Sequence, residues 1–450
     1  MISLSFVLYI PHGTERKAVM TYTDLLFVFG LLPAYIIIVF VCRENWEKNV
    51  ASLAFSLVFI LWARPAYYAL VVIDLFVIYA AGRFKRAGRY KAARAAALGF
   101  TGLTLLPMLL SPGEGVGQAV ASLGFGVFWL RSLIYLRDKE SETNFLNLAV
   151  YLISLEFMTV APLMTYSEMK EQICKRKVSL AMLAAGFERF ACGLFAVTVL
   201  GYPLERLRAA AMLSGSVPYL NAIVGLAATA VLIYTALFGF LSMSEGLCLI
   251  GGFRVPLRDA GFLPKSLIID HVRYSYPPLW DSLRGIFDDA GAAALPIAGA
   301  VFCLLTGAGI GFGAAGLAFA GVIGAALVMQ MMFETRRTAA AGVFSALMWL
   351  AAVIAATGGS VFGIADWFAA FVPGKYEFDI GFELYNELGR SLVWGLLAVV
   401  YVSPLRMAAG RRLREAMGES ETAYGAVRLA GVVISVAALA LSAVAMVSAV

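Results

Sequence analysis

The chain has 450 residues, of which 61% are hydrophobic and 14% are charged, and its mean hydropathy is +0.84. Because a soluble domain carries about 25% charged residues, this composition excludes a water-soluble globular protein, and the net charge of +6 reflects short basic loops instead of a nucleic-acid surface. Five cysteines without a C-x-x-C pair and only two histidines exclude a zinc knuckle, a dithiol redox couple and a histidine-rich metal site.

Residues 1–19 differ from the rest of the chain. They are too short and too weakly apolar to span a membrane, and their charges follow the apolar run, which is the reverse of a signal peptide. We interpret them as a dispensable extension in front of a start at Met20, and we give His12, which lies there, no role. Residues 20–450 contain no long soluble insertion and are predicted to form one membrane domain.

Apolar segments recur along residues 20–450, and about 11–13 of them are long enough to span a membrane or to re-enter it. The sequence therefore predicts an all-α polytopic membrane protein. Arg64-Pro65 separates the second predicted helix from the third. The predicted helices lie at 25–41, 51–62, 67–81, 95–110, 117–135, 145–164, 180–200, 217–241, 295–311, 313–332, 339–356, 391–402 and 425–450.

Three basic loops set the expected topology. Lysine and arginine gather at 83–94, 170–177 and 406–414. Positively charged loops stay on the cytoplasmic side of a membrane, so we predict that all three are cytoplasmic.

Several ionisable side chains lie inside apolar segments, where a charge is expensive and usually faces a partner or a cavity. Glu156 is in the predicted helix at 145–164 and is expected to face such a partner or cavity. Glu188 and Arg189 are expected to pair with neighbouring helices, and Asp74 is a further intramembrane carboxylate.

The longest polar interval of the chain, residues 257–291, interrupts the apolar pattern. It holds His271, Trp280, Asp281 and Arg284 among other charged and aromatic residues. Two interpretations remain open for it. The interval carries the chemistry of the protein together with its flanking helices, or it is a solvated cytoplasmic loop with amphipathic pieces that lie on the membrane.

A set of collinear segments extends over about residues 20–410: MTYTDLLFVFGLLPAYIIIVFV, LWARPAYYALVVIDLFVIYAAGR, Phe128–Tyr135 (FWLRSLIY), Asn144–Met169 (NFLNLAVYLISLEFMTVAPLMTYSEM) and Gly252–Pro256 (GFRVP). Together they resemble the membrane-bound O-acyltransferases of the alginate O-acetyltransferase and teichoic-acid D-alanyltransferase type. FWLRSLIY stands where that family has ISFYTFQ-x-x-SYL, and GFRVP matches the family's GFRLP.

The resemblance implies a funnel-like helical bundle in the bacterial cytoplasmic membrane, pierced by a channel. It implies an acyl donor from the cytoplasmic side, either acyl-CoA or an acyl carrier, if the protein is active, and no bound cofactor. The implied partners are membrane lipids and a secreted or membrane-anchored component of a cell-surface polymer acylation system, with no nucleic acid. In the family, a histidine in LWHGAxW acts as the base on the acceptor hydroxyl.

The sequence departs from three family signatures. In LLTGAGIG, residues 304–311, Thr306 takes the place of the histidine, and a hydroxyl has no pKa near neutrality. The family's FWRRWHxS keeps only Trp280, which is followed by Asp281-Ser282-Leu283-Arg284. The family's DFSGYSD corresponds to residues 236–242, which have lost both aspartates.

Three functional interpretations follow. The favoured one is a catalytically degenerate relative that keeps the fold and serves a partner. The second is an active acyltransferase in which His271 acts, oriented by Asp270, Glu245 or Asp281. The third is a transporter or lipid-handling protein that uses Asp74, Glu156 and Glu188. The candidates to line the channel or contact the acceptor are Trp280, Asp281, Arg284 and Glu245.

Overall fold

The computed structural model describes residues 22–63, 65–84, 125–138, 144–158, 164–212, 219–255, 339–357, 382–403 and 421–448, with short pieces at 96–97, 99–100, 321–326 and 329–330 and single residues at 405, 409, 412 and 415. All regular secondary structure in these ranges is helical, which confirms the all-α class. The extension at 1–19, the polar interval at 257–291 and the predicted helix at 295–311 lie outside the described residues.

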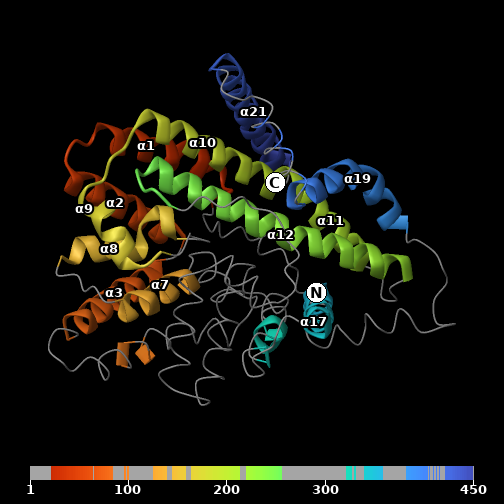
Figure 1. The fold of residues 1–450 in the computed structure, drawn as a ribbon, viewed down its shortest axis with the longest axis horizontal. Helices are drawn as coiled ribbons and strands as arrows, with labels where there is room; N and C mark the ends of the chain where they lie inside the picture. Colours follow the sequence, from red (N-terminus) through yellow and green to blue (C-terminus); the bar gives the residue numbers. More distant parts are fainter. Residues whose placement is uncertain are drawn as a thin grey trace.

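Three helical segments open the fold (Figure 1). A π-turn, η1 (Phe27–Leu31), runs directly into α1 (Leu32–Val41), and α2 (Asn45–Ala63) follows. α3 (Pro65–Phe84) begins on a proline, because the first position of a helix needs no N–H donor. The break predicted at Arg64-Pro65 is thus confirmed by the boundaries of α2 and α3.

The next part of the chain corrects one predicted span. After α7 (Phe125–Arg137), α8 (Phe145–Ile153) has only nine residues, and the extended residue Ser154 (φ −68°, ψ 149°) separates it from the 3₁₀ turn η3 (Leu155–Phe157). The single helix predicted at 145–164 is therefore wrong. Its pattern of apolar residues is the same as that of a span, but the chain turns so that Glu156 meets polar partners.

The basic stretch at 170–177 is also not a loop over most of its length. Thr165 and Glu168 form a capping box that starts α9 (Tyr166–Cys174). Only the short linker at 175–179 is not helical, and Arg176 within that linker is buried. The prediction of a basic loop at 170–177 is therefore wrong for most of the stretch, and the side chain of Arg176 points into the protein.

Three helices in the described part of the chain are long and apolar enough to cross a membrane: Leu180–Ala211, Tyr219–Ile250 and Leu429–Ser448. The first is continuous through α10 (Leu180–Phe195), the π-turn η4 (Ala196–Leu200) and α11 (Gly201–Met212), and the second is α12 (Tyr219–Ile250). At 32 residues each, they are about 48 Å long, which exceeds the roughly 30 Å hydrocarbon core of a bilayer. The protein is thus an all-α membrane protein.

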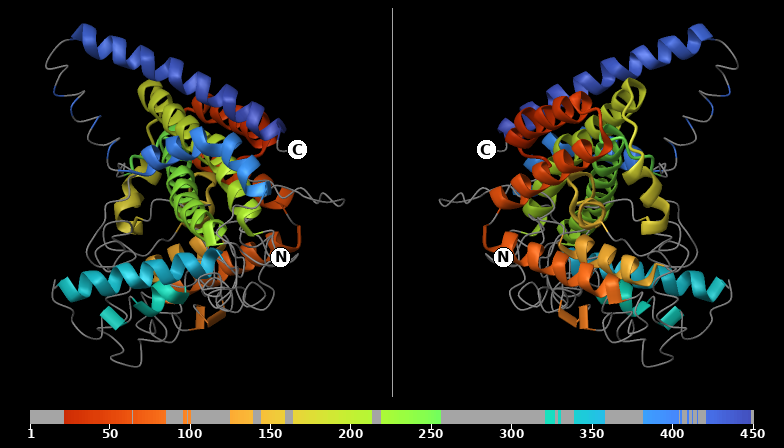
Figure 2. Two further views of the ribbon diagram at one scale, coloured as in Figure 1. Left: turned by 90° about the vertical axis from the view of Figure 1, so that its right-hand side faces the viewer. Right: turned by 90° about the vertical axis from the view of Figure 1, so that its left-hand side faces the viewer.

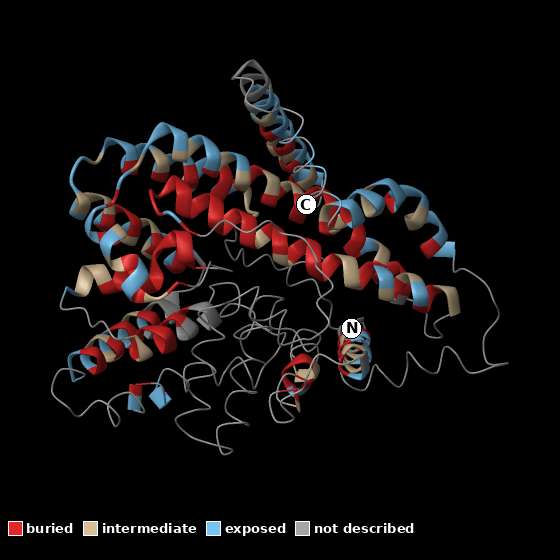
Figure 3. Ribbon diagram, viewed as in Figure 1, coloured by how far each residue is buried: buried red, intermediate tan, exposed pale blue. Residues whose placement is uncertain are grey.

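Glycines allow α10 and α12 to approach closely. The two helices are antiparallel, with Gly186 opposite Gly246 and Gly193 opposite Gly239. A Cβ atom at Gly186 would lie 2.6 Å from the carbonyl oxygen of Gly246, and a Cβ atom at Gly246 would lie 2.6 Å from that of Gly186. α12 is accordingly the most continuously buried helix in Figure 3. Small residues commonly permit this kind of contact between membrane helices.

The C-terminal helices lie at the edges of the described body. They are α17 (Ala339–Thr357), α19 (Phe382–Val402), which packs against α11 and α12, and α21 (Glu421–Ser448), which crosses α10 (Figure 2). Large apolar side chains on α19 and α21 are exposed, among them Leu396 and Val433. In a membrane protein such surfaces face lipid, so their exposure carries no hydrophobic penalty.

Candidate functional site

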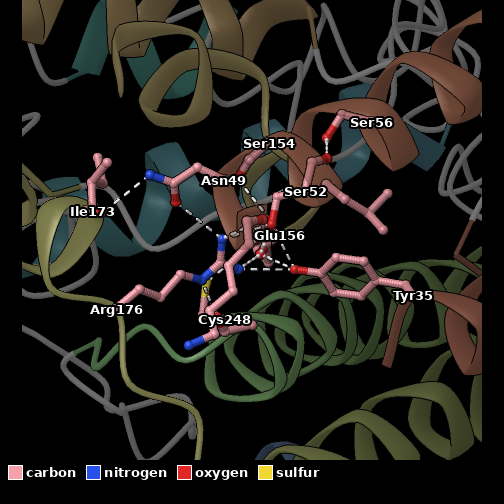
Figure 4. Close-up of polar contacts among 12 residues, drawn as sticks. Tyr35, Asn49, Ser52, Ser56, Ser154, Glu156, Ile173, Arg176 and Cys248 are labelled. Carbon is pink, nitrogen blue, oxygen red and sulfur yellow. Dashed lines mark hydrogen bonds and ion pairs between the residues drawn. The ribbon is translucent and has the colours of Figure 1, made fainter. Parts of the chain in front are cut away.

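The most concentrated group of buried polar side chains surrounds Glu156 and Arg176 (Figure 4). We call it the Glu156–Arg176 network. It joins five parts of the chain: α1, α2, the turn at 154–157, the linker at 175–179 and the end of α12. Its members besides the two charged residues are Tyr35, Asn49, Ser52, Ser154 and the backbone carbonyls of Lys48 and Gly251.

Glu156 is fully buried, and both of its carboxylate oxygens accept hydrogen bonds. Oε1 accepts from Arg176 Nη2 at 2.5 Å and from Ser52 Oγ at 3.2 Å, and it also accepts a short bond from the Tyr35 hydroxyl. Oε2 accepts from Ser154 Oγ at 2.7 Å. A buried carboxylate is tolerated when it is paired and hydrogen-bonded in this way.

Arg176 has a side-chain exposure of 0%, and its guanidinium donates in several directions. Nη1 donates to Ser52 Oγ at 2.7 Å, and Nη2 donates to Tyr35 Oη at 2.9 Å as well as to Glu156. Nη1 also approaches the carbonyl of Lys48 at 3.3 Å, and Nε donates to the carbonyl of Gly251. A planar guanidinium with five donors suits such a junction better than an ammonium group.

The end of α12 is shaped to receive Arg176. Gly252 has φ +85°, and the bonds Phe253 N to Cys248 O (2.8 Å) and Gly252 N to Leu249 O (3.0 Å) form a Schellman motif. A Cβ atom at Gly251 would collide with the Glu156 carboxylate and lie 2.7 Å from Arg176 Nη2. Glycine is needed at 251 for space and at 252 for its backbone conformation.

A second arginine lies beside the network. Arg131 of α7 is fully buried, with its guanidinium carbon 4.6 Å from the ring centre of Tyr151 and 4.0 Å from that of Phe157. The Phe157 ring is 5.2 Å from that of Phe253, on which Arg176 lies at 4.2 Å. Two buried cations are thus separated by a pair of aromatic rings, and the rings offer each cation a partial negative face.

The Glu156–Arg176 network is built to hold chain segments together. Because both oxygens of Glu156 already accept hydrogen bonds, this carboxylate is poorly placed to take a proton from a substrate. The expectation that Glu156 faces a partner or cavity is confirmed, and the partner is Arg176. In the described ranges, no group of three or more histidine, cysteine or acidic residues could hold a metal ion.

Among the candidate site residues, the structure describes Glu245 alone. Glu245 is 1% exposed on α12 and forms a short ion pair with Arg189 of α10. The expected pairing of Arg189 with a neighbouring helix is therefore confirmed. Outside the described residues lie Asp270, His271, Trp280, Asp281, Arg284 and Thr306.

The other two intramembrane carboxylates lie in different surroundings. Asp74 on α3 is fully buried. Glu188 on α10 is exposed and lies against α21, since a Cβ atom at Gly431 would be 3.2 Å from its Oε1. Neither residue belongs to the Glu156–Arg176 network, so the structure does not bring together the three carboxylates of the transporter interpretation.

Sequence reasoning missed Arg176 and Tyr35 as members of one site. Arg176 lay in a run of basic residues, which is the usual sign of a cytoplasmic loop. The signal that could have found it is Glu156 itself, because a buried carboxylate requires a cation, and Arg176 follows it by only twenty residues.

Comparison with protein-family models and with curated proteins gives no match for this chain.

Proposed function

We propose that this chain is a catalytically degenerate relative of the membrane-bound O-acyltransferases. It resides in the bacterial cytoplasmic membrane as a multi-pass protein. It keeps the helical scaffold of that family and serves a secreted or membrane-anchored partner in the acylation of a cell-surface polymer. Thr306, at the position of the family histidine, leaves it without that base.

One observation carries the proposal: two of the segments that carry the resemblance, 144–169 and 252–256, pack together. Phe157 from the first segment contacts Phe253 from the second, with ring centres 5.2 Å apart. Both segments also contribute to the Glu156–Arg176 network or its immediate border. Their joint packing supports the idea that the sequence has kept the residues of a scaffold while losing those of a catalytic site.

The position of Glu245 favours the degenerate relative over the active alternative. In that alternative Glu245 is one of the carboxylates that could orient His271. Glu245 is instead buried and held by Arg189. An imidazole that took Glu245 as its partner would compete with a guanidinium for the same oxygens, and the charged pair is the stronger one.

The test measures acyl groups on the surface polymer in a deletion strain that carries the wild-type gene, Thr306→Ala or His271→Ala. We expect deletion to alter the acyl content and each variant to restore it nearly in full. The loss of one hydrogen bond in a variant lowers the stability of the protein by only roughly 1 kcal/mol. An active site would lose two or more orders of magnitude in rate on losing its base, as general bases contribute about 10²–10⁴-fold.

Two outcomes of this test contradict the proposal. If either variant is present in the membrane at normal abundance and fails to restore the acyl content, the chain is an enzyme. If deletion leaves the acyl content unchanged, the chain does not serve polymer acylation.

The cytoplasmic position of the stretch at 170–177 can be tested with a native reporter. Cys174 is exposed at the end of α9, whereas Cys248 is buried. In a variant that keeps only Cys174, a membrane-impermeant maleimide should label the protein in inverted membrane vesicles and leave it unlabelled in intact cells. Labelling in intact cells would reverse the topology, and Cys174→Ser gives the background.

A further inference from the structure

Arg131 is a buried cation that the Glu156–Arg176 network does not use. It lies on α7 with an exposed fraction of 0%, and its guanidinium carbon is 4.6 Å from the ring centre of Tyr151 and 4.0 Å from that of Phe157. Its Nη2 donates to the thioether sulfur of Met169 at 3.3 Å, which is a weak acceptor. In the described part of the chain, its Nε and Nη1 have no hydrogen-bond partner.

The charge balance around Arg131 is unfavourable as it stands. Glu156, the buried carboxylate of the neighbouring network, already accepts from Arg176, Tyr35 and Ser154. Arg131, Arg176 and Glu156 together leave one positive charge in a buried environment. Burying an unpaired ion is costly, and two aromatic rings close to the guanidinium offset only part of that cost.

The depth of Arg131 suggests which anion would compensate it. Arg131 lies two helical turns before Asp138, about 10 Å along the helix axis. Asp138 is partly exposed and accepts from the backbone N–H of Ser167, next to the cap of α9. The α9 end of the protein is the side on which the basic stretch at 170–177 is predicted to face the cytoplasm. Arg131 is therefore about 10 Å farther from that end of the protein than Asp138.

We propose that Arg131 anchors a binding site for a phosphate group, in which its Nε–H and Nη1–H donate to phosphate oxygens. Phosphate fits because it supplies negative charge and several strong acceptors to a guanidinium whose Nε–H and Nη1–H have no acceptor in the described part of the chain. The same chemistry is offered by the headgroup of a membrane phospholipid and by a water-soluble phosphate ester. Tyr151 and Phe157 hold the guanidinium in place, and Met169 fixes Nη2.

The experiment uses the full chain purified in a non-ionic detergent. In the first arm, the thermal unfolding midpoint is measured while inorganic phosphate replaces chloride at constant ionic strength. In the second arm, phosphatidylglycerol is added to the delipidated protein, and native mass spectrometry counts the lipids that stay bound. The variants are Arg131→Gln and Arg131→Lys. The control is Arg83→Gln, since Arg83 is an exposed arginine near the ring of Tyr79.

At a ligand concentration one hundred times the dissociation constant, a site present only in the folded protein raises the folded-to-unfolded ratio about 100-fold. We expect wild type and Arg83→Gln to show this stabilisation in at least one arm, Arg131→Lys to show a weaker response, and Arg131→Gln to show none. A response to phosphate without binding of phosphatidylglycerol identifies a soluble phosphate ester as the source, and binding of phosphatidylglycerol, with or without a response to phosphate, identifies a lipid headgroup.

The proposal is overturned if wild type responds in neither arm, or if Arg131→Gln responds as wild type does. Should Arg131→Gln fail to fold, the comparison of wild type with Arg131→Lys decides. If wild type and Arg131→Lys then respond equally to phosphate and equally to phosphatidylglycerol, the site does not depend on the guanidinium and the proposal is refuted.

Discussion

Arg176→Ala is expected to lower the stability of the protein more than any other single substitution in the described linkers. Removing the guanidinium leaves the Glu156 carboxylate buried without its cation, and breaking a buried ion pair on one side costs about 3–5 kcal/mol. The substitution also removes the donor to the carbonyl of Gly251, at the end of α12. The measurement is the yield of folded protein in membranes, together with the apparent unfolding midpoint in detergent.

Lys175→Ala provides a matched control one residue away. Lys175 pairs with Glu171 at 3.5 Å, but their side chains are 74% and 80% exposed. Exposed pairs contribute about 0–1 kcal/mol, so Lys175→Ala should leave yield and midpoint nearly unchanged. Equal effects of the two substitutions would show that burial of the Glu156–Arg176 pair has no energetic consequence.

The double variant Glu156→Gln with Arg176→Gln separates charge from packing. It removes both buried charges and keeps an amide that can hydrogen-bond at each position, although glutamine is shorter than arginine. We expect it to be more stable than Arg176→Ala, because no uncompensated ion remains. If the double variant is less stable than Arg176→Ala, the effect of Arg176 comes from shape and hydrogen bonds, and the explanation by an unpaired charge is wrong.

Several parts of the fold could be predicted because apolar length dominates them. The sequence predicts the helices at 180–200 and 217–241 from hydropathy alone, and both exist, although each continues for about another two to three turns. Their extensions, such as 242–250 on α12, hold polar residues like Glu245 that lower the hydropathy locally. The ion pair of Glu245 with Arg189 stabilises α12 in that polar stretch.

The interruption at Ser154 could not be predicted in the same way. Residues 145–164 are apolar enough for a span, and only one charged residue, Glu156, lies among them. The helix ends where Glu156 forms an ion pair with Arg176 and hydrogen bonds with Tyr35 and Ser52. These three residues come from three other segments of the chain. Such partners cannot be predicted from the local sequence, because tertiary packing determines them.

The Glu156–Arg176 network lies in segments whose sequences look like an ordinary membrane span and an ordinary basic loop. A run of lysine and arginine predicts a cytoplasmic loop, and the exposed side chain of Lys175 is compatible with that prediction. Arg176 lies in the same basic run of the sequence, but its side chain points inward. The free energy cost of burying Glu156 alone is greater than that of burying the Glu156–Arg176 pair. A buried acid is thus a reason to search the nearest basic loop for its partner.

Gly246→Ala is the second substitution for which a large effect is expected. A Cβ atom at Gly246 would lie 2.6 Å from the carbonyl oxygen of Gly186, and 2.7 Å and 3.0 Å from the backbone N and Cα of Phe190. All three are backbone atoms of α10, so no side chain can rotate away, and the two helices must move apart. Overpacking of this kind costs about 1–3 kcal/mol, and separation of the helices also weakens the Arg189–Glu245 pair.

The control for Gly246→Ala is Gly389→Ala on α19, where an added Cβ atom meets nothing within 4 Å. Alanine favours a helix over glycine by roughly 0.5–1 kcal/mol, so Gly389→Ala should raise the unfolding midpoint slightly while Gly246→Ala lowers it. Gly186→Ala, on the facing helix, should behave like Gly246→Ala because its Cβ atom meets the carbonyl of Gly246. If Gly246→Ala stabilises the protein as Gly389→Ala does, then α10 and α12 are farther apart in the membrane than their glycines allow, and the close crossing is wrong.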